Sequence, residues 1–165
     1  MIAVTVAQVS LSNVGFVVLL QSSLDKRVLP IFIGATEAQA IALFMDKVRV
    51  PRPMTHDLIK SLLDNLECRM KRVEIHDLRD NTFYASLVLE TNGAEALLDA
   101  RPSDAIALAL RAAAPIFVDE KVMEAAGIFL NGAAAPDAQG GHAPARKLTP
   151  RDALREQLAK AVAEE

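Results

Sequence analysis

Two short polar segments of this chain place acid–base and phosphate-binding side chains at the start of an apolar helix. The first, residues 51–57, reads Pro-Arg-Pro-Met-Thr-His-Asp, and the second, residues 99–105, reads Asp-Ala-Arg-Pro-Ser-Asp-Ala. The N-terminus of a helix carries unpaired N–H groups and partial positive charge, which suit anions such as phosphate. Two such helix starts with carboxylates, arginines and a histidine provide the groups that phosphodiester hydrolysis needs. Two well-capped helices with ordinary loops are the alternative interpretation.

Three side chains in these segments are candidate catalytic groups. His56 is the first choice for a general acid or base, because the charge of an imidazole changes near neutral pH. Since it is the second residue of its predicted helix, we expect it to be partly exposed. Asp57 and Asp104 complete the set, although an acid in a first turn also stabilises its own helix. For each of the three, a capping or packing role is the alternative.

A second set of side chains could bind the phosphate. Arg101 follows a predicted strand and precedes a predicted helix, where a guanidinium can bind phosphate through two N–H groups. A structural ion pair is the alternative for this arginine. The full set of candidates is Arg52, Arg101, Thr55 and Ser103.

Carboxylates near these segments could hold a divalent cation. Mg²⁺ and Mn²⁺ prefer carboxylate and water oxygens, so either ion is the expected cofactor, and no organic cofactor is expected. The candidate ligands are Glu37, Asp99 and Asp104.

Composition limits the classes of function. A net charge of −3 and 4% aromatic residues argue against a module that holds nucleic acid stably, so DNA or RNA is expected as a substrate rather than as a lasting partner. No apolar run reaches the roughly 18 residues of a membrane span. The first residues alternate as in a strand and do not resemble a signal peptide. The single cysteine, Cys68, cannot form an internal disulfide, and we expect a cytoplasmic protein.

The hydrophobic pattern predicts an α+β domain in which helices pack against a mixed β-sheet. The predicted strands are residues 2–9, 15–20, 28–33, 69–78, 82–90, 95–100 and 116–118. The predicted helices are residues 36–47, 55–67, 103–114 and 119–126. Pro30 suggests that its strand lies at an edge or is irregular. Thr55 is predicted to cap the second helix, whose stripe on one face is Leu58, Leu62, Leu63 and Leu66.

Two helices lack a polar face, which bears on the oligomeric state. The helix at 36–47 is apolar nearly all round, so sheet, other helices or another subunit should bury it. The helix at 104–114 begins with Asp104 and after it carries only one charge, at Arg111. A domain this small has little area with which to cover both helices. We therefore expect a homo-oligomer, with a dimer preferred.

Two parts of the chain show a weak internal sequence similarity. Strands followed by Thr-Glu-Ala at 36–38 and an Ala-rich helix recur as strands followed by Ser-Asp-Ala at 103–105 and a similar helix. Duplication of a strand-strand-helix unit explains this similarity, and chance in a biased composition explains it as well.

The sequence divides the chain into three parts. Residues 1–130 form the predicted domain, and residues 131–148 read as a flexible linker rich in Ala, Gly and Pro. Residues 149–165 begin with a strong helix start and carry a narrow stripe of Leu154, Leu158 and Val162. Such a short amphipathic helix is expected to dock on a partner or to fray.

Several segments together resemble the bifunctional nuclease domain family. They are residues 29–34, 37–41, 51–58, 82–85, 99–108 and 115–118, in the order and at the spacing of that family. The resemblance covers residues 1–130. It implies an α+β domain with a mixed sheet, homo-oligomers, and an activity on both DNA and RNA in some members. Residues 154–165 also resemble the first helix of the helical hairpin of nucleotide-excision-repair subunits, a motif for protein–protein contact whose second helix is missing here.

Two functions therefore remain open at the level of sequence. The first is a nuclease of low sequence selectivity, in which the two segments form one site. The second is a non-enzymatic oligomeric module that binds an anionic ligand or a protein through the same segments. Both need the segments to meet, and we predict that they do, because equivalent strand–helix loops of one sheet commonly lie at the same edge.

Overall fold

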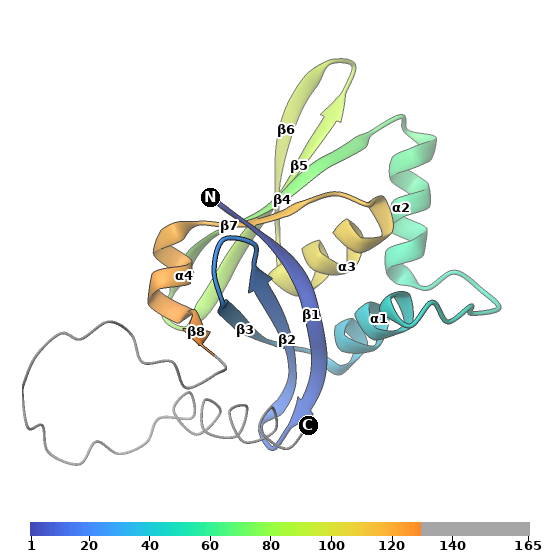
Figure 1. The fold of residues 1–165 in the computed structure, drawn as a ribbon. Coiled ribbons are helices and arrows are strands. Elements are labelled where there is room, and N and C mark those ends of the chain that lie inside the picture. Colours follow the sequence, from blue (N-terminus) through green and yellow to red (C-terminus); the bar gives the residue numbers. More distant parts are fainter. Residues whose placement is uncertain (130–165) are drawn as a thin grey trace, which may run out of the picture.

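A computed structural model describes residues 1–129, which form one eight-stranded sheet and four helices (Figure 1). The strands are β1 (Ile2–Ser12), β2 (Gly15–Ser22), β3 (Arg27–Ile33), β4 (Arg69–Arg79), β5 (Thr82–Thr91), β6 (Ala94–Ala100), β7 (Ile116–Val118) and β8 (Ile128–Phe129). The helices are α1 (Ala35–Met45), α2 (Thr55–Asn65), α3 (Pro102–Ala112) and α4 (Glu120–Ala126). The predicted α+β class is confirmed. The predicted linker and C-terminal helix lie outside the described residues.

The sheet consists of two antiparallel meanders joined by a short central strand. Its strand order is β6-β5-β4-β7-β1-β2-β3-β8. β7 pairs antiparallel with β1 and parallel with β4, which makes the sheet mixed. The meander β1-β2-β3 leads into α1, and the meander β4-β5-β6 leads into α3. Each meander thus has three strands followed by a helix, whereas the duplication hypothesis had two strands and a helix.

Proline 30 lies where the sheet can accept a residue without a backbone N–H. It pairs with Leu19 of β2 on one side of β3. On the other side, β8 pairs only with Arg27 and Val28, so this part of β3 is an edge within the described chain. The expected edge position is confirmed.

The helix α3 is the buried centre of the helical layer. It packs against α1 and α2 on one side and against β3, β4 and β5 on the other, and Figure 1 shows these three helices together, away from α4. Seven of its residues are buried, including Ile106 and Leu108. Of the expected ways to bury this helix, the sheet and the other helices of the same chain do so here.

The other two helices of this layer leave apolar surface exposed. In α1, the core-facing residues Ala38 and Ile41 are buried, but Phe44 is 42% exposed. In α2, Leu63 packs against the core, while the rest of the predicted stripe faces outward. The exposed residues of that stripe are Leu58, Leu62 and Leu66. Among residues 1–129, no helix is long and apolar enough to span a membrane.

Candidate functional site

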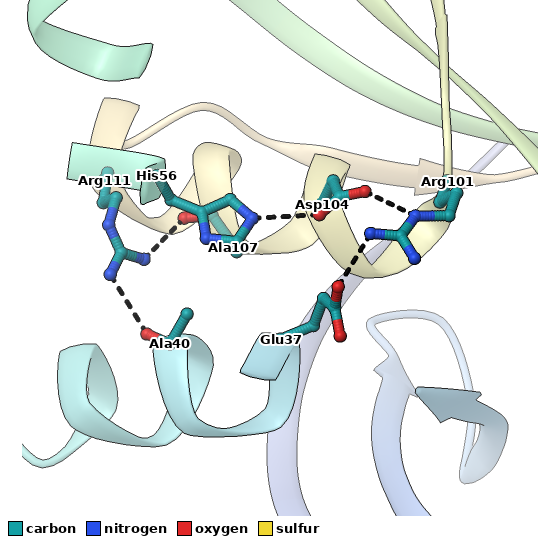
Figure 2. A network of polar contacts seen from close by, with 7 residues as sticks. All are labelled: Glu37, Ala40, His56, Arg101, Asp104, Ala107 and Arg111. Carbon is teal, nitrogen blue, oxygen red and sulfur yellow. Dashed lines mark hydrogen bonds and ion pairs between the residues drawn. The ribbon is translucent and has the colours of Figure 1, made fainter. Parts of the chain in front are cut away.

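The two polar segments meet at the helix starts, as predicted. Nε2 of His56, at the start of α2, lies 3.0 Å from Oδ1 of Asp104, at the start of α3 (Figure 2). With Asp104 ionised, its oxygen accepts this hydrogen bond, so Nε2 is the protonated nitrogen. The contact between α2 and α3 therefore includes an acid–base pair, joined across 48 residues of sequence.

Arg101 ties the same aspartate to a third helix. Its Nε donates to Oδ2 of Asp104 at 2.7 Å, and its Nη2 donates to Oε1 of Glu37 at 2.7 Å. Glu37 and Asp104 are each the third residue of their helix, α1 and α3. The two comparable helix starts therefore share one guanidinium between their first-turn acids. The side chain of Arg101 is 68% exposed, and its Nη1 has no partner among residues 1–129.

Gly34 makes room for the carboxylate of Glu37. A Cβ atom built on Gly34 would lie 2.2 Å from Oε2 of Glu37. Any larger residue would push this carboxylate away from the start of α1 and so from Arg101. The absence of a side chain at position 34 thus helps to form the Glu37–Arg101 pair.

Opposing effects set the charge of Asp104. Burial raises the pKa of its carboxyl, but hydrogen bonds from Arg101 and His56 outweigh burial and hold that pKa below its ordinary value. The aspartate is therefore ionised at neutral pH. Its side chain is 29% exposed, whereas that of His56 is 6% exposed. Asp104 and Arg101 are thus the groups that a dissolved ligand can reach.

The burial of His56 differs from the sequence-based expectation. We expected partial exposure for the second residue of a helix, but His56 is only 5% exposed, because α3 packs over its side chain. Its imidazole lies behind Asp104 as seen from solvent. Any chemical role of His56 must therefore act through Asp104 or through a small molecule such as water.

Asp57 forms a second ion pair, with the buried Arg111 of α3. Its Oδ2 accepts the backbone N–H of Met54 at 2.8 Å, and its Oδ1 accepts Nε of Arg111 at 2.5 Å. Burial raises the pKa of the Asp57 carboxyl, but these two donors outweigh it and lower the pKa overall. Asp57 therefore caps α2 and neutralises a buried arginine.

Arg111 is the member of this cluster that sequence reasoning missed. It also donates to the carbonyl oxygens of Ala107 in α3 and Ala40 in α1, at 2.9 and 3.1 Å (Figure 2). Together with its pair to Asp57, these bonds join α1, α2 and α3. Its guanidinium lies 5.4 Å from the ring centroid of Phe44. The available signal was one charge within the apolar part of α3 after Asp104, since such a charge needs a buried partner.

The remaining predicted phosphate-binding residues occupy different surroundings. Thr55 is exposed and is the first residue of α2, so the predicted cap is wrong: Met54 is the N-cap residue, and Asp57 accepts its N–H. Arg52 is exposed in the loop before α2, outside the cluster. Ser103 is 7% exposed at the second position of α3, next to Arg101.

The candidate metal ligands do not form a metal site as they are arranged. Within the described part of the chain, no group of three or more His, Cys, Asp or Glu could hold a metal ion. Glu37 and Asp104 are bridged by Arg101, which a cation would have to displace. Asp99 lies on exposed β6 opposite Ser86 and makes no hydrogen bond or ion pair with Glu37 or Asp104. Dependence on Mg²⁺ or Mn²⁺ stays a prediction.

Known proteins resemble this chain over the folded region. The model of the bifunctional nuclease domain matches residues 17–131. An uncharacterized protein of Mycobacterium tuberculosis is 46% identical over 114 residues, which are 69% of this chain and 68% of that protein. Bifunctional nuclease 1 of Oryza sativa subsp. japonica is 29% identical over 97 residues, and that of Arabidopsis thaliana is 28% identical over 95. The matched region is 29% of each plant protein.

The family match includes most elements that build the cluster. It begins within β2 and continues past β8, so α1, α2 and α3 all lie inside it. The first-turn acids, Arg101 and the buried His56 are therefore parts of the matched domain rather than of an appended segment. The chain belongs to the bifunctional nuclease domain family.

Proposed function

We propose that this protein is a nuclease of low sequence selectivity that hydrolyses phosphodiester bonds of DNA and RNA at the Arg101–Asp104 cluster. Membership of the bifunctional nuclease domain family supports the reaction class. The observation that carries the location is the exposed guanidinium of Arg101, held at the start of α3 beside an ionised aspartate. The plant relatives named as bifunctional nucleases support the same reaction class.

In this proposal, Arg101 binds the scissile phosphate. Its Nη1 has no partner among residues 1–129, and the helix start beside it leaves backbone N–H groups without helical partners, so a phosphate bound there can accept hydrogen bonds from both. A guanidinium also stabilises the negative charge that grows on the phosphate in the transition state. These groups contact only the backbone of the substrate, which accounts for the low selectivity.

Asp104 orients the attacking water and takes up its proton as the water oxygen bonds to phosphorus. The ester P–O bond on the opposite side of the phosphorus breaks, and the leaving oxygen takes a proton from solvent water. Its Oδ1 is already held by His56 and its Oδ2 by Arg101, so the carboxylate has one fixed orientation. His56 is then a positioning residue, because it is buried and acts through Asp104. The ion pair of Asp57 and Arg111 supports this arrangement by fixing α2 against α3.

A non-enzymatic module that binds an anionic ligand is the second candidate function. The observation that favours it is that Arg101 pairs with both carboxylates and, with His56, holds the pKa of Asp104 below its ordinary value. Counting Glu37 and Asp104 as −1 each and Arg101 as +1, the cluster carries −1 when His56 is neutral. Such a cluster can hold an anion at Arg101 without offering a strong base.

We also propose that the protein is a cytoplasmic homo-oligomer, most simply a dimer. The stripe on α2 supports association, because Leu58, Leu62 and Leu66 are 64%, 55% and 62% exposed. Three large apolar side chains on one exposed helix face are typical of a protein–protein contact. The lone, unpaired Cys68 suits a reducing compartment.

A cleavage assay with Arg101 variants tests the proposed function. Arg101→Gln should lower the rate on labelled single-stranded RNA and DNA by roughly 10²-fold, as expected for losing one charged stabiliser of the transition state. Arg101→Lys should keep part of the rate, because it keeps the charge but not the paired N–H geometry. Lys26→Gln is the matched control, since Lys26 is exposed and far along the chain from the cluster. Equal rates for all four proteins would contradict the proposal.

The same assay separates the two candidate functions. EDTA should abolish cleavage, and added Mg²⁺ or Mn²⁺ should restore it, because Mg²⁺ commonly binds through one or two carboxylates together with substrate phosphates. The binding-module alternative predicts that the protein binds the labelled RNA or DNA but does not cleave it, either in EDTA or with added Mg²⁺ or Mn²⁺.

A further inference from the structure

A groove opens beside Arg101, and His56 is not among the residues that line it. Its volume is about 380 Å³, which lies within the range of small-ligand sites. The end of β3, the β4–β5 turn and the start of α3 form its walls. Its apolar lining includes Phe32 and Phe83, and its polar lining includes Asn81, Thr82, Arg101 and Ser103.

The two phenylalanines give the groove an aromatic wall. Phe32 is 47% exposed although it lies in a strand of the sheet, so its ring is available to a ligand. Phe83 is partly buried and packs against the main core, which holds its position. Aromatic rings of this kind are surfaces on which nucleic-acid bases stack, largely irrespective of base identity.

Ser103 provides an independent sign that the groove takes a polar ligand. Ser103 is only 7% exposed, and it lines the groove. Its hydroxyl makes no hydrogen bond with residues 1–129, and because no fully buried side-chain oxygen among them lacks a partner, this oxygen is open to the groove. A hydroxyl in this position can donate to an acceptor that enters the groove, such as a phosphate oxygen. Asn81 and Thr82 add an exposed amide and a hydroxyl at the β4–β5 turn.

From this arrangement we propose that the groove is a base-binding subsite for single-stranded nucleic acid. One base stacks on Phe32 and Phe83, while the adjoining phosphate lies on Arg101 and the hydroxyl of Ser103. The base must leave its double helix to enter the groove, because the face of a paired base is covered by its neighbours. The inference rests on the proposed function for its substrate class, and it adds that single strands are preferred over duplexes.

The test is a binding measurement that does not depend on cleavage. Fluorescence anisotropy in EDTA, with probe integrity checked on a gel, would compare three labelled probes of eight positions. They are an oligothymidine, an abasic oligomer of the same backbone charge, and a duplex. We expect the wild-type protein to bind oligothymidine more tightly than either of the other two.

Variants then assign the preference to the groove. Phe32→Ala should weaken binding of oligothymidine roughly 5- to 100-fold, the range for loss of one stacking platform, and leave the abasic probe unchanged. Ser103→Ala, which keeps the helix, should weaken both probes, because it removes a phosphate contact. Phe129→Ala is the matched control, since Phe129 is 48% exposed and does not line the groove. Circular dichroism would check that each variant is folded.

The possible outcomes separate this inference from the proposed function. Equal binding of oligothymidine and the abasic probe, or an unchanged affinity after Phe32→Ala, would overturn the base-binding subsite even if the protein cleaves nucleic acid. Base-dependent binding that Phe32→Ala removes would support the subsite, even if no cleavage is found and the nuclease proposal fails.

Discussion

Nε2 of His56 and Oδ1 of Asp104 lie 3.0 Å apart and join the two helix starts that the sequence singles out. The pair is asymmetric, because the imidazole is buried and the carboxylate is partly exposed. Arg101 holds the other oxygen of the same carboxylate and links it to Glu37. Asp104 of α3 is therefore linked to α2 through His56, and to α1 through Arg101 and Glu37.

A double-mutant cycle on this pair should show coupling between the two side chains. His56→Gln and Asp104→Asn should each lower the free energy of unfolding, because each removes a charge-assisted hydrogen bond. The double variant should lose less unfolding free energy than the two single variants lose together, with a coupling energy of about 1 kcal/mol or more. Urea denaturation of the four proteins provides the values. Additive losses would mean that the contact contributes nothing to stability.

Removal of Arg111 should destabilise the domain more than removal of any surface charge. Arg111→Met keeps the length of the side chain but leaves Asp57 and two helical carbonyl groups without their donor. The loss in unfolding free energy should be about 3 kcal/mol, typical of breaking a buried pair. Thermal and urea denaturation would measure it, with Lys26→Met as control. A change equal to that of the control would contradict the structural role assigned to Arg111.

Stability should fall in acid because of the two paired aspartates. The pKa values of Asp57 and Asp104 are lower in the folded protein than their ordinary value of 3.8. Their contribution is therefore fully present above pH 3.8 and is lost as the pH falls through their lower folded-state values. Thermal melts between pH 7 and pH 2 should show that Tm falls more steeply with acid in the wild type than in the double variant Asp57→Asn/Asp104→Asn. An identical fall of Tm in both proteins would contradict this assignment.

The leucine stripe on α2 should determine the oligomeric state. Light scattering at micromolar concentration should give a dimer or larger assembly for the wild type. Leu62→Glu should shift it toward monomer, because Leu62 is 55% exposed in the centre of the stripe and a buried glutamate there would lack a partner. Leu24→Glu is the control, since Leu24 is 73% exposed outside α2. A wild-type monomer would contradict the proposed association.

Local signals in the sequence were sufficient for most elements of the fold. Asp119 was predicted to start the last helix, and its side chain does accept the N–H of Lys121. The hairpin of β4 and β5 and the edge position of Pro30 follow from turn residues and from the chemistry of proline. These features depend on neighbours in sequence, and therefore the sequence predicts them well.

The candidate site was predictable only in part. The meeting of the two segments followed from the repeated strand–helix order, and the His56–Asp104 contact confirms it. The burial of His56 was not predictable, because it depends on how α3 packs over α2. The same holds for Arg111, whose partners come from α1 and α2. Such features arise from packing between helices distant in sequence, which local patterns do not encode.

Cleavage by purified Asp104→Asn is the most direct test of the central claim, that Asp104 is the reactive group of a nuclease. Asparagine keeps the shape of the side chain and removes its charge. Release of labelled fragments from RNA and DNA should fall by roughly 10²-fold or more relative to the wild type, as for loss of a general base. Asp46→Asn is the matched control, because Asp46 is exposed at the opposite end of α1. Equal release by the wild type and Asp104→Asn would contradict the account.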